Sequence, residues 1–301
     1  MPPKLEGVVF DPVTRRRFGS LAVTLLAGAA AAGACARSDG SPAGFEQVEL
    51  DGWGGPRLQA YFHRADGWDE SWPVVIVLHG ANRNVDYTAS TWLPLAGQMQ
   101  VMPVIPHFTE HRFRGDRYAL GGIRRGSMGS KSAFNAIEPL FDIVRDVTGS
   151  RSQRYSLFGH SAGAQFVERF LLFNPAARVD RSVMSMAGYY TLPDTRLPWP
   201  YGLAQVAIGE DSFARLLARD CMVVLGVEDN DPRDERLRRT SLARLQGAHR
   251  LERGLNFFSR ATRFAEINGL PMNWQLRVLS DVDHDSRAAA IASAEWLANG
   301  A

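Results

Sequence analysis

The chain has 301 residues, enough for one large α/β domain, and its 45% hydrophobic and 22% charged residues are ordinary for a globular protein. The formal net charge is +2, and residues 1–34 alone carry a net charge of +2, so the remainder is neutral. That balance gives no reason to expect nucleic acid or an anionic surface as a partner. Of the two cysteines, Cys35 lies near the N-terminal segment and Cys221 opens an apolar run, so we predict no disulfide.

Residues 1–34 have the pattern of an export signal. Thr14-Arg15-Arg16-Arg17-Phe18 resembles the twin-arginine motif, and Leu21–Ala34 follows as 14 uncharged, mostly small residues. That length suits the apolar region of a signal peptide and is short for a membrane span. The alternative is a basic arm beside a short buried helix, but a run so rich in Ala and Gly is a poor basis for a packed core helix. We therefore expect an exported protein that is periplasmic, held in the cell envelope or extracellular.

Two processing sites remain open after this signal. Ala32-Gly33-Ala34-Cys35 resembles a lipoprotein box, in which a lipid on Cys35 would be the protein's link to a membrane. The overlapping Ala34-Cys35-Ala36 would instead be cut after Ala36. Residues 35–44 contain a run of small and turn-forming residues and are predicted to be a flexible tether. The expected organisation is a signal peptide over 1–34, the tether over 35–44 and one folded domain over 45–301.

Apolar runs and helical patterns alternate along residues 45–301. Strands are predicted over Phe45–Leu50, Leu58–Phe62, Pro73–Leu78, Val101–Ile105, Tyr155–Gly159, Ser182–Met186, Met222–Val227 and Trp274–Leu279. Helices are predicted over Ser132–Val147, Gln165–Phe173, Phe257–Asn268 and Ser286–Leu297. The alternation predicts an α/β fold with a mostly parallel eight-stranded sheet, helices on both faces and no large cap domain. In such sheets the functional site lies at the carboxyl ends of the strands.

One of these strand ends carries the motif around which the chain is organised. Gly159-His160-Ser161-Ala162-Gly163 fits G-x-S-x-G and lies between a predicted strand and a predicted helix, which is the context of a nucleophile elbow. The turn is so tight that the outer positions need residues without a Cβ, and the central residue takes a strained backbone conformation. Ser161 is therefore the predicted nucleophile. The Ala162 N–H, at a helix N-terminus, is a predicted donor to an oxyanion.

A serine nucleophile needs a base to take its proton and a carboxylate to orient that base. His284 follows the last predicted strand in a loop that can reach back over the sheet edge, so it is the predicted base. Asp229 is the predicted acid because it follows Gly226 by three residues, directly after an apolar strand. Asp231 is the main rival, although its place before Pro232 favours an extended backbone that turns it outward.

Further candidates lie on the loops of the same edge. Gly80 lets the chain turn close to a substrate, so the Ala81 N–H is the expected second oxyanion donor, and His79 is expected to brace that loop. The aromatic residues predicted to bind substrate are Trp92, Tyr189, Tyr190 and Trp199. The alternative for these rings is that they pack a long loop onto the body of the domain.

The His-Gly pair after the third strand, G-H-S-A-G, Gly226-x-x-Asp229 and the late His284 resemble the α/β-hydrolase superfamily across residues 45–301. Within it, the spacing is most similar to secreted polyhydroxybutyrate-depolymerase and feruloyl-esterase-type hydrolases. These relatives often have H-G-C-x-Q where this chain has His79-Gly80-Ala81-Asn82-Arg83. The resemblance implies a serine hydrolase that cleaves small or polymeric carboxylic esters through an acyl-enzyme, without a cofactor.

Three other functions are weighed against this one. A serine peptidase of the same fold would use the same residues, whereas a non-catalytic envelope binding protein would need none of them. His107-Phe108-Thr109-Glu110-His111 fits the zinc-hydrolase pattern H-x-x-E-H, but that pattern needs a helix and here it follows Pro106 at a strand end. We therefore predict no metal.

Overall fold

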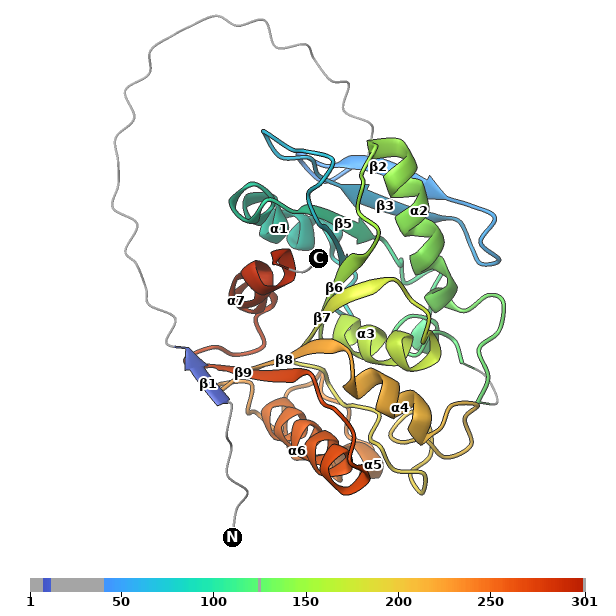
Figure 1. The fold of residues 1–301 in the computed structure, drawn as a ribbon. Coiled ribbons are helices and arrows are strands. Elements are labelled where there is room, and N and C mark those ends of the chain that lie inside the picture. The colour runs from blue at the N-terminus through green and yellow to red at the C-terminus, as the bar shows by residue number, and fades with distance from the viewer. Residues whose placement is uncertain (1–7, 12–40, 124–125, 300–301) are drawn as a thin grey trace, which may run out of the picture.

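The computed structural model describes residues 8–11, 41–123 and 126–299 (Figure 1). The twin-arginine motif, the apolar signal run and Cys35 lie outside the described residues, as does the tether up to residue 40. Apart from residues 124–125, the predicted domain is described from its first strand to its last helix. Among the described residues, no helix is long and apolar enough to cross a membrane.

Within the described residues, nine strands form one sheet, in the order β1-β9-β8-β7-β6-β4-β5-β3-β2. The antiparallel pairs are β2 with β3 and β3 with β5, at one edge of the sheet, and the other neighbouring pairs are parallel. Eight of the strands occupy the predicted positions: β2 (Glu46–Leu50), β3 (Leu58–Phe62), β4 (Val74–Leu78), β5 (Met102–Pro106), β6 (Tyr155–His160), β7 (Val179–Ser185), β8 (Asp220–Gly226) and β9 (Trp274–Leu279). The expected mostly parallel sheet is therefore confirmed.

The ninth strand, β1 (Val8–Asp11), is an addition that the sequence reading did not predict. It pairs parallel with β9, from Val8 opposite Leu276 to Asp11 opposite Leu279. A strand at the edge of a sheet leaves a row of backbone N–H and C=O groups open, and any short extended segment can pair with it. β1 falls inside residues 1–34, the segment predicted to be the signal peptide.

Helices cover both faces of the sheet (Figure 1). They are α1 (Val85–Met99), α2 (Ile137–Thr148), α3 (Ala162–Phe173), α4 (Glu210–Leu217), α5 (Ser241–Arg244), α6 (Arg250–Asn268) and α7 (Ser286–Ala298), with the 3-10 turns η1 (Gly115–Arg117) and η2 (Ala133–Ala136). α1 and α7 lie on one face, and α2, α3, α4 and α6 lie on the other.

The buried strands supply both cores because side chains alternate across a sheet. In β4, Val75 and Val77 join the core beneath α1 and α7, whereas Ile76 and Leu78 join the core beneath α2 and α3. All five residues of β4 are buried, which explains why the sequence reads as a continuous apolar run. The carboxyl ends of these buried parallel strands bring distant parts of the chain to the same edge of the sheet.

Candidate active site

The turn between β6 and α3 has the geometry of a nucleophile elbow. Ser161 sits at its apex with φ 55° and ψ −110°, and its N–H donates to the Ser185 carbonyl at 2.9 Å. A Cβ on Gly159 would lie 2.3 Å from the Gly163 carbonyl oxygen, and one on Gly163 would lie 2.2 Å from the Leu78 oxygen. Neither position therefore accepts a side chain, because strand, turn and helix meet there backbone to backbone.

Asp229 and His284 meet at the ends of β8 and β9. His284 Nδ1 lies 2.8 Å from Asp229 Oδ2, and both side chains are largely buried. The loops after β8 and β9 close on one another because Gly226 has no side chain: a Cβ there would lie 2.4 Å from the Val282 carbonyl oxygen. Asp231 is exposed, and its Oδ1 accepts from the Arg233 N–H at 2.9 Å. The register that places Asp229 beside His284 is thus the one the sequence favoured.

His284 contacts the elbow through His160, the residue that precedes Ser161 in the motif. The rings of His160 and His284 lie 4.5 Å apart between centroids, and His160 Nδ1 lies 3.2 Å from Ser185 Oγ. Burial, together with the nearby His284, holds the pKa of His160 well below its usual value, so His160 is a neutral ring against which His284 packs. Within the described part of the chain, Ser161 Oγ and His284 are not hydrogen-bonded to each other. A base and nucleophile of this kind commonly tighten only when substrate is bound.

Arg250 is a partner of Asp229, the predicted acid, that the sequence reading missed. Its Nη1 donates to Asp229 Oδ1 at 3.0 Å and to Asp234 Oδ2 at 2.9 Å. The side chain of Arg250, at the first position of α6, is only 3% exposed. The hydrogen bond from Arg250 lowers the pKa of Asp234 to about 2, so Asp234 remains ionised over the working range. Asp229 is therefore the carboxylate at the centre of the site, with His284 on one oxygen and the buried Arg250 on the other.

Asp234 belongs to a run over 233–239 that is rich in arginine and also contains two acids. The spacing of residues along a loop does not show which side chain folds back onto the site. The excess of charged residues near the predicted acid is the one sequence signal that could have pointed to Asp234.

A cavity of about 560 Å³ opens in front of Ser161, the predicted nucleophile, and we call it the Ser161 cavity. Ala81 and Ala162 line it together with Ser161, so both predicted oxyanion donors belong to residues at the cavity. His79 lies behind Ala81, and burial lowers its pKa to about 3. The neutral ring accepts the Phe108 N–H at Nε2, 3.2 Å away, and its Nδ1 lies 3.1 Å from the Gly80 carbonyl oxygen. His79 thus holds the Ala81 loop in place, the bracing role that the sequence suggested.

The aromatic candidates divide. Tyr189 lines the Ser161 cavity, whereas Trp199 packs its ring against Phe173 at 5.4 Å. Two substrate-binding predictions are wrong. Trp92 is 1% exposed because it faces inward from α1 and packs on Phe158.

Tyr190 is the second correction. Its side chain is fully buried and stacks on Phe257 of α6, with 4.2 Å between ring centroids and 12° between ring planes. Aromatic side chains in loops serve the core as readily as a binding surface, because they bury the largest apolar area.

Arginines form much of the remaining wall of the Ser161 cavity. They are Arg83, Arg236, Arg238, Arg239 and Arg250, against the two acids Glu110 and Asp116. Arg83 pairs with Glu110 at 3.3 Å, and Arg238 lies over the Tyr189 ring at 5.7 Å. The cavity is consequently electropositive around an apolar aromatic surface. Among the described residues, no group of three His, Cys, Asp or Glu side chains is arranged to hold a metal ion.

Comparison with known proteins gives the same fold. No protein-family model and no curated protein sequence matches the chain. Poly(aspartic acid) hydrolase-1 from Sphingomonas sp. KT-1 is a similar solved structure, with 31% identity, a TM-score of 0.81 and coverage of 85% of this chain and 99% of that chain. LpqC, the poly(3-hydroxybutyrate) depolymerase from Bordetella parapertussis, has 28% identity and a TM-score of 0.76, covering 84% of this chain and 90% of its own.

A more distant match, the siderophore hydrolase EstB from Aspergillus nidulans, has 15% identity and a TM-score of 0.53, and shares the fold. With its sheet order, its elbow and these neighbours, the chain belongs to the α/β-hydrolase superfamily, as its motifs predicted. It is a hydrolase of the esterase and depolymerase type.

Proposed function

We propose that this protein is an exported serine hydrolase that cleaves carboxylic esters through a covalent acyl-enzyme. The observation that carries the proposal is the Asp229–His284 hydrogen bond of 2.8 Å beside the strained Ser161 turn. Because Nδ1 of His284 faces Asp229, Nε2 is the nitrogen left to serve Ser161. A binding protein would have no use for this arrangement, since every part of it serves proton transfer at one hydroxyl.

The residues define the steps. Ser161 Oγ attacks the ester carbonyl carbon while His284 Nε2 takes the hydroxyl proton, and the carbonyl oxygen becomes an oxyanion. The N–H groups of Ala81 and Ala162 stabilise that oxyanion, and one such donor contributes about 3–4 kcal/mol. The alcohol leaves with the proton held by His284, and Ser161 keeps the acyl group. Water then attacks the acyl-enzyme by the same route in reverse and releases the acid.

Amide cleavage is the second candidate, and one observation favours it. The 31% identical structure is a poly(aspartic acid) hydrolase, and the units of such a polymer are joined by amide bonds. LpqC, at 28% identity, is a depolymerase of a polyester. The same acyl-enzyme chemistry serves both bonds, which differ mainly in the leaving group that His284 must protonate.

Export is proposed from the sequence alone. The signal pattern in residues 1–34 precedes every residue of the site, so processing at residue 34 or 36 leaves Ser161, Asp229 and His284 in the mature chain. Replacing Arg15 and Arg16 with Lys should leave the precursor in the cytoplasm. Normal export of that variant would contradict the twin-arginine route, and palmitate labelling that depends on Cys35 would identify a lipoprotein.

The experiment for the chemistry uses protein lacking residues 1–36. A fluorophosphonate probe should label the wild type and spare Ser161→Ala, and a series of p-nitrophenyl esters and anilides should show which bond is cleaved. Higher kcat/KM on esters supports the leading proposal, whereas higher values on anilides favour the amide alternative. Equal labelling of both proteins would exclude Ser161 as the nucleophile.

A further inference from the structure

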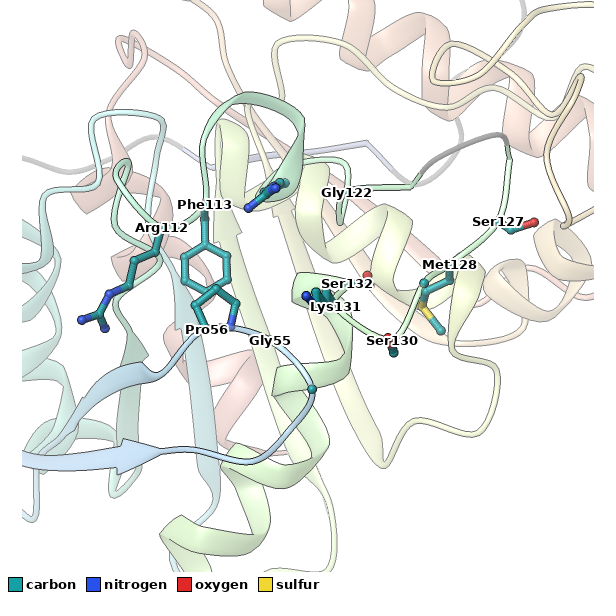
Figure 2. Close-up of a pocket in the computed structure, with 13 residues that line it drawn as sticks. Gly55, Pro56, Arg112, Phe113, Gly122, Ser127, Met128, Ser130, Lys131 and Ser132 are labelled. Atoms are coloured by element: carbon teal, nitrogen blue, oxygen red, sulfur yellow. The ribbon is translucent and has the colours of Figure 1, made fainter.

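A second cavity, of about 740 Å³, lies beside the Ser161 cavity, and segment 110–122 contributes residues to both. Figure 2 shows Phe113 and Pro56 on one side of it and Met128 and Lys131 on the other. We call it the basic cavity because its charged lining residues are Arg112, Arg117 and Lys131. No carboxylate lines it among the described residues.

The walls of the basic cavity are held by contacts within the fold. Asn135 Nδ2 donates to the carbonyl oxygens of Gly129 and Ser130, each at 3.1 Å, which fixes the loop on one side. On the other side, the rings of Trp53 and Phe113 are nearly parallel, at 13° and 6.3 Å between centroids. The cavity is therefore preformed, and a ligand need not order its walls on binding.

Gly54, which lines the basic cavity, leaves no room for a side chain. A Cβ on Gly54, which has φ +96°, would lie 2.7 Å from the Ser130 carbonyl oxygen. The turn between β2 and β3 and the loop after residue 126 thus meet backbone to backbone. This contact joins the two sides of the cavity and keeps its width set by the fold.

The cationic side chains of the basic cavity are free for a ligand. Arg117 and Lys131 are exposed, and no carboxylate within the described parts of the chain pairs with either. Arg112 Nη1 donates to the Arg57 carbonyl oxygen at 2.8 Å, and the other N–H donors and the charge of Arg112 are available to a ligand. Pro56 and Met128 supply apolar surface beside these charges. Cations around an apolar floor suit a chain that carries carboxylates on a carbon backbone.

We propose that the basic cavity binds an anionic segment of a chain-like substrate whose scissile bond lies at Ser161. Segment 110–122 is the wall that the two cavities share, so one chain can occupy both. Arg238 and Arg239 continue the positive charge on the rim of the Ser161 cavity. The substrate class is therefore an oligomer or polymer bearing several carboxylates. This inference rests on the proposed function, because it takes Ser161 to be the reacting residue.

The test measures binding separately from catalysis. Poly-L-glutamate of about 20 residues is titrated against the Ser161→Ala protein, and a triglutamate serves as the short probe, since an extended residue spans only about 3.5 Å. Replacing Arg117 and Lys131 with Gln should weaken binding of the long probe by about fivefold to tenfold, the effect of losing two partly solvated charge contacts. Affinity should fall as salt rises. The matched control replaces Arg260 and Arg263, two exposed arginines of α6, with Gln and should leave the affinity unchanged.

The link to Ser161 is tested with the wild type. The long probe should inhibit hydrolysis of the neutral ester p-nitrophenyl acetate competitively, and triglutamate should inhibit far less. Equal weakening by both double variants, equal binding of uncharged poly(ethylene glycol), or binding without inhibition would overturn the proposal. Thermal melting identifies a variant that fails to fold, and a single Lys131→Gln change then replaces the double variant. Failure of the wild type to hydrolyse esters or to react with a fluorophosphonate would contradict the proposed function and leave the binding result intact.

Discussion

At the scale of single residues, Asp229 is the point on which the site depends, because its two oxygens have different partners. Oδ2 faces His284 at 2.8 Å and Oδ1 accepts from Arg250 at 3.0 Å. The first contact occupies Nδ1 of the imidazole and leaves Nε2 available for Ser161, the proposed nucleophile, and the second holds the carboxylate itself. Both contacts involve buried side chains, so water replaces neither well.

Asp229→Asn should lower kcat by roughly 10⁴-fold while keeping the fold, because an amide presents the wrong hydrogen-bonding pattern and leaves the forming imidazolium unpaired. Asp231→Asn is the matched control and should cost less than about tenfold, since Asp231 is exposed and, among the described residues, its side chain hydrogen-bonds only within its own turn. Measuring kcat for both variants at matched thermal stability decides between them. A crippled Asp231→Asn enzyme would mean that the acid has been assigned two residues too early.

Arg250→Gln should lower kcat/KM by roughly tenfold or more, because Asp229 Oδ1 loses the buried donor that holds the carboxylate beside His284. Asp234→Asn should cost less, since Arg250 keeps its hydrogen bond to Asp229. Measuring kcat/KM for both variants at matched thermal stability compares the two changes. Equal losses would show that the contact between Arg250 and Asp229 has no part of its own in the reaction.

The residues that the sequence could predict are those tied to a strand end. Ser161, Asp229 and His284 each follow a strong apolar strand, and parallel strands bring their carboxyl ends to one edge. Arg250 could not be predicted, because it begins a helix some 20 residues after the acid and only the folded loop brings the two together. The predictions for Trp92 and Tyr190 failed for a related reason, since sequence does not show whether a ring faces a cavity or the core.

At the scale of elements, α3 carries two buried ionisable side chains, Glu168 and Arg169. Glu168 and Arg169 are both fully buried, and Glu168 Oε1 accepts the Thr191 N–H at 2.7 Å. Burial raises the pKa of Glu168 to about 8 from a value of 4.5 in the unfolded chain. The folded protein therefore holds a proton that the unfolded chain lacks between these two values. Its stabilising effect is complete below pH 4.5 and is lost as pH rises to about 8.

Glu168→Gln should remove this pH dependence, because Gln keeps the acceptor for Thr191 and does not titrate. The free energy of unfolding of the wild type, relative to the variant, should fall with pH between 5 and 8 by at most about 1.4 kcal/mol per pH unit. Denaturant unfolding at several pH values measures the difference, with the exposed Glu266→Gln as the control. Parallel stability profiles for wild type and Glu168→Gln would contradict the assignment of a buried, protonated carboxyl.

The sheet was predictable at this scale because buried parallel strands read as continuous apolar runs, as Val74–Leu78 does. The helices were harder to predict from the sequence than the strands. α1 contains Pro94 and a mixture of polar residues, and α4 and α5 are short, with 8 and 4 residues. Short helices have weak periodic patterns and form because the fold packs them, not because of their own propensity.

At the scale of the whole molecule, the sheet from β2 to β9 contains every strand that positions the site, and β1 adds only an edge. Protein lacking residues 1–36 should therefore unfold cooperatively and keep wild-type ester hydrolysis, with Tm lowered by a few degrees at most. Differential scanning calorimetry and a p-nitrophenyl ester assay on both forms measure this. A truncated protein that is insoluble or inactive would show that Val8–Asp11 belongs to the functional domain and that residues 1–34 are not a removable signal.

The central claim is that the acyl group of the substrate is transferred to Ser161. Rapid mixing of the wild type with excess p-nitrophenyl acetate, an acid quench and peptide mapping by mass spectrometry test it most directly. We predict that an acetyl group accumulates on the peptide containing Ser161, up to about one equivalent per enzyme molecule, and that its formation matches the first p-nitrophenol released. Acetylation of a different residue, or turnover by Ser161→Ala at the wild-type rate, would contradict the account.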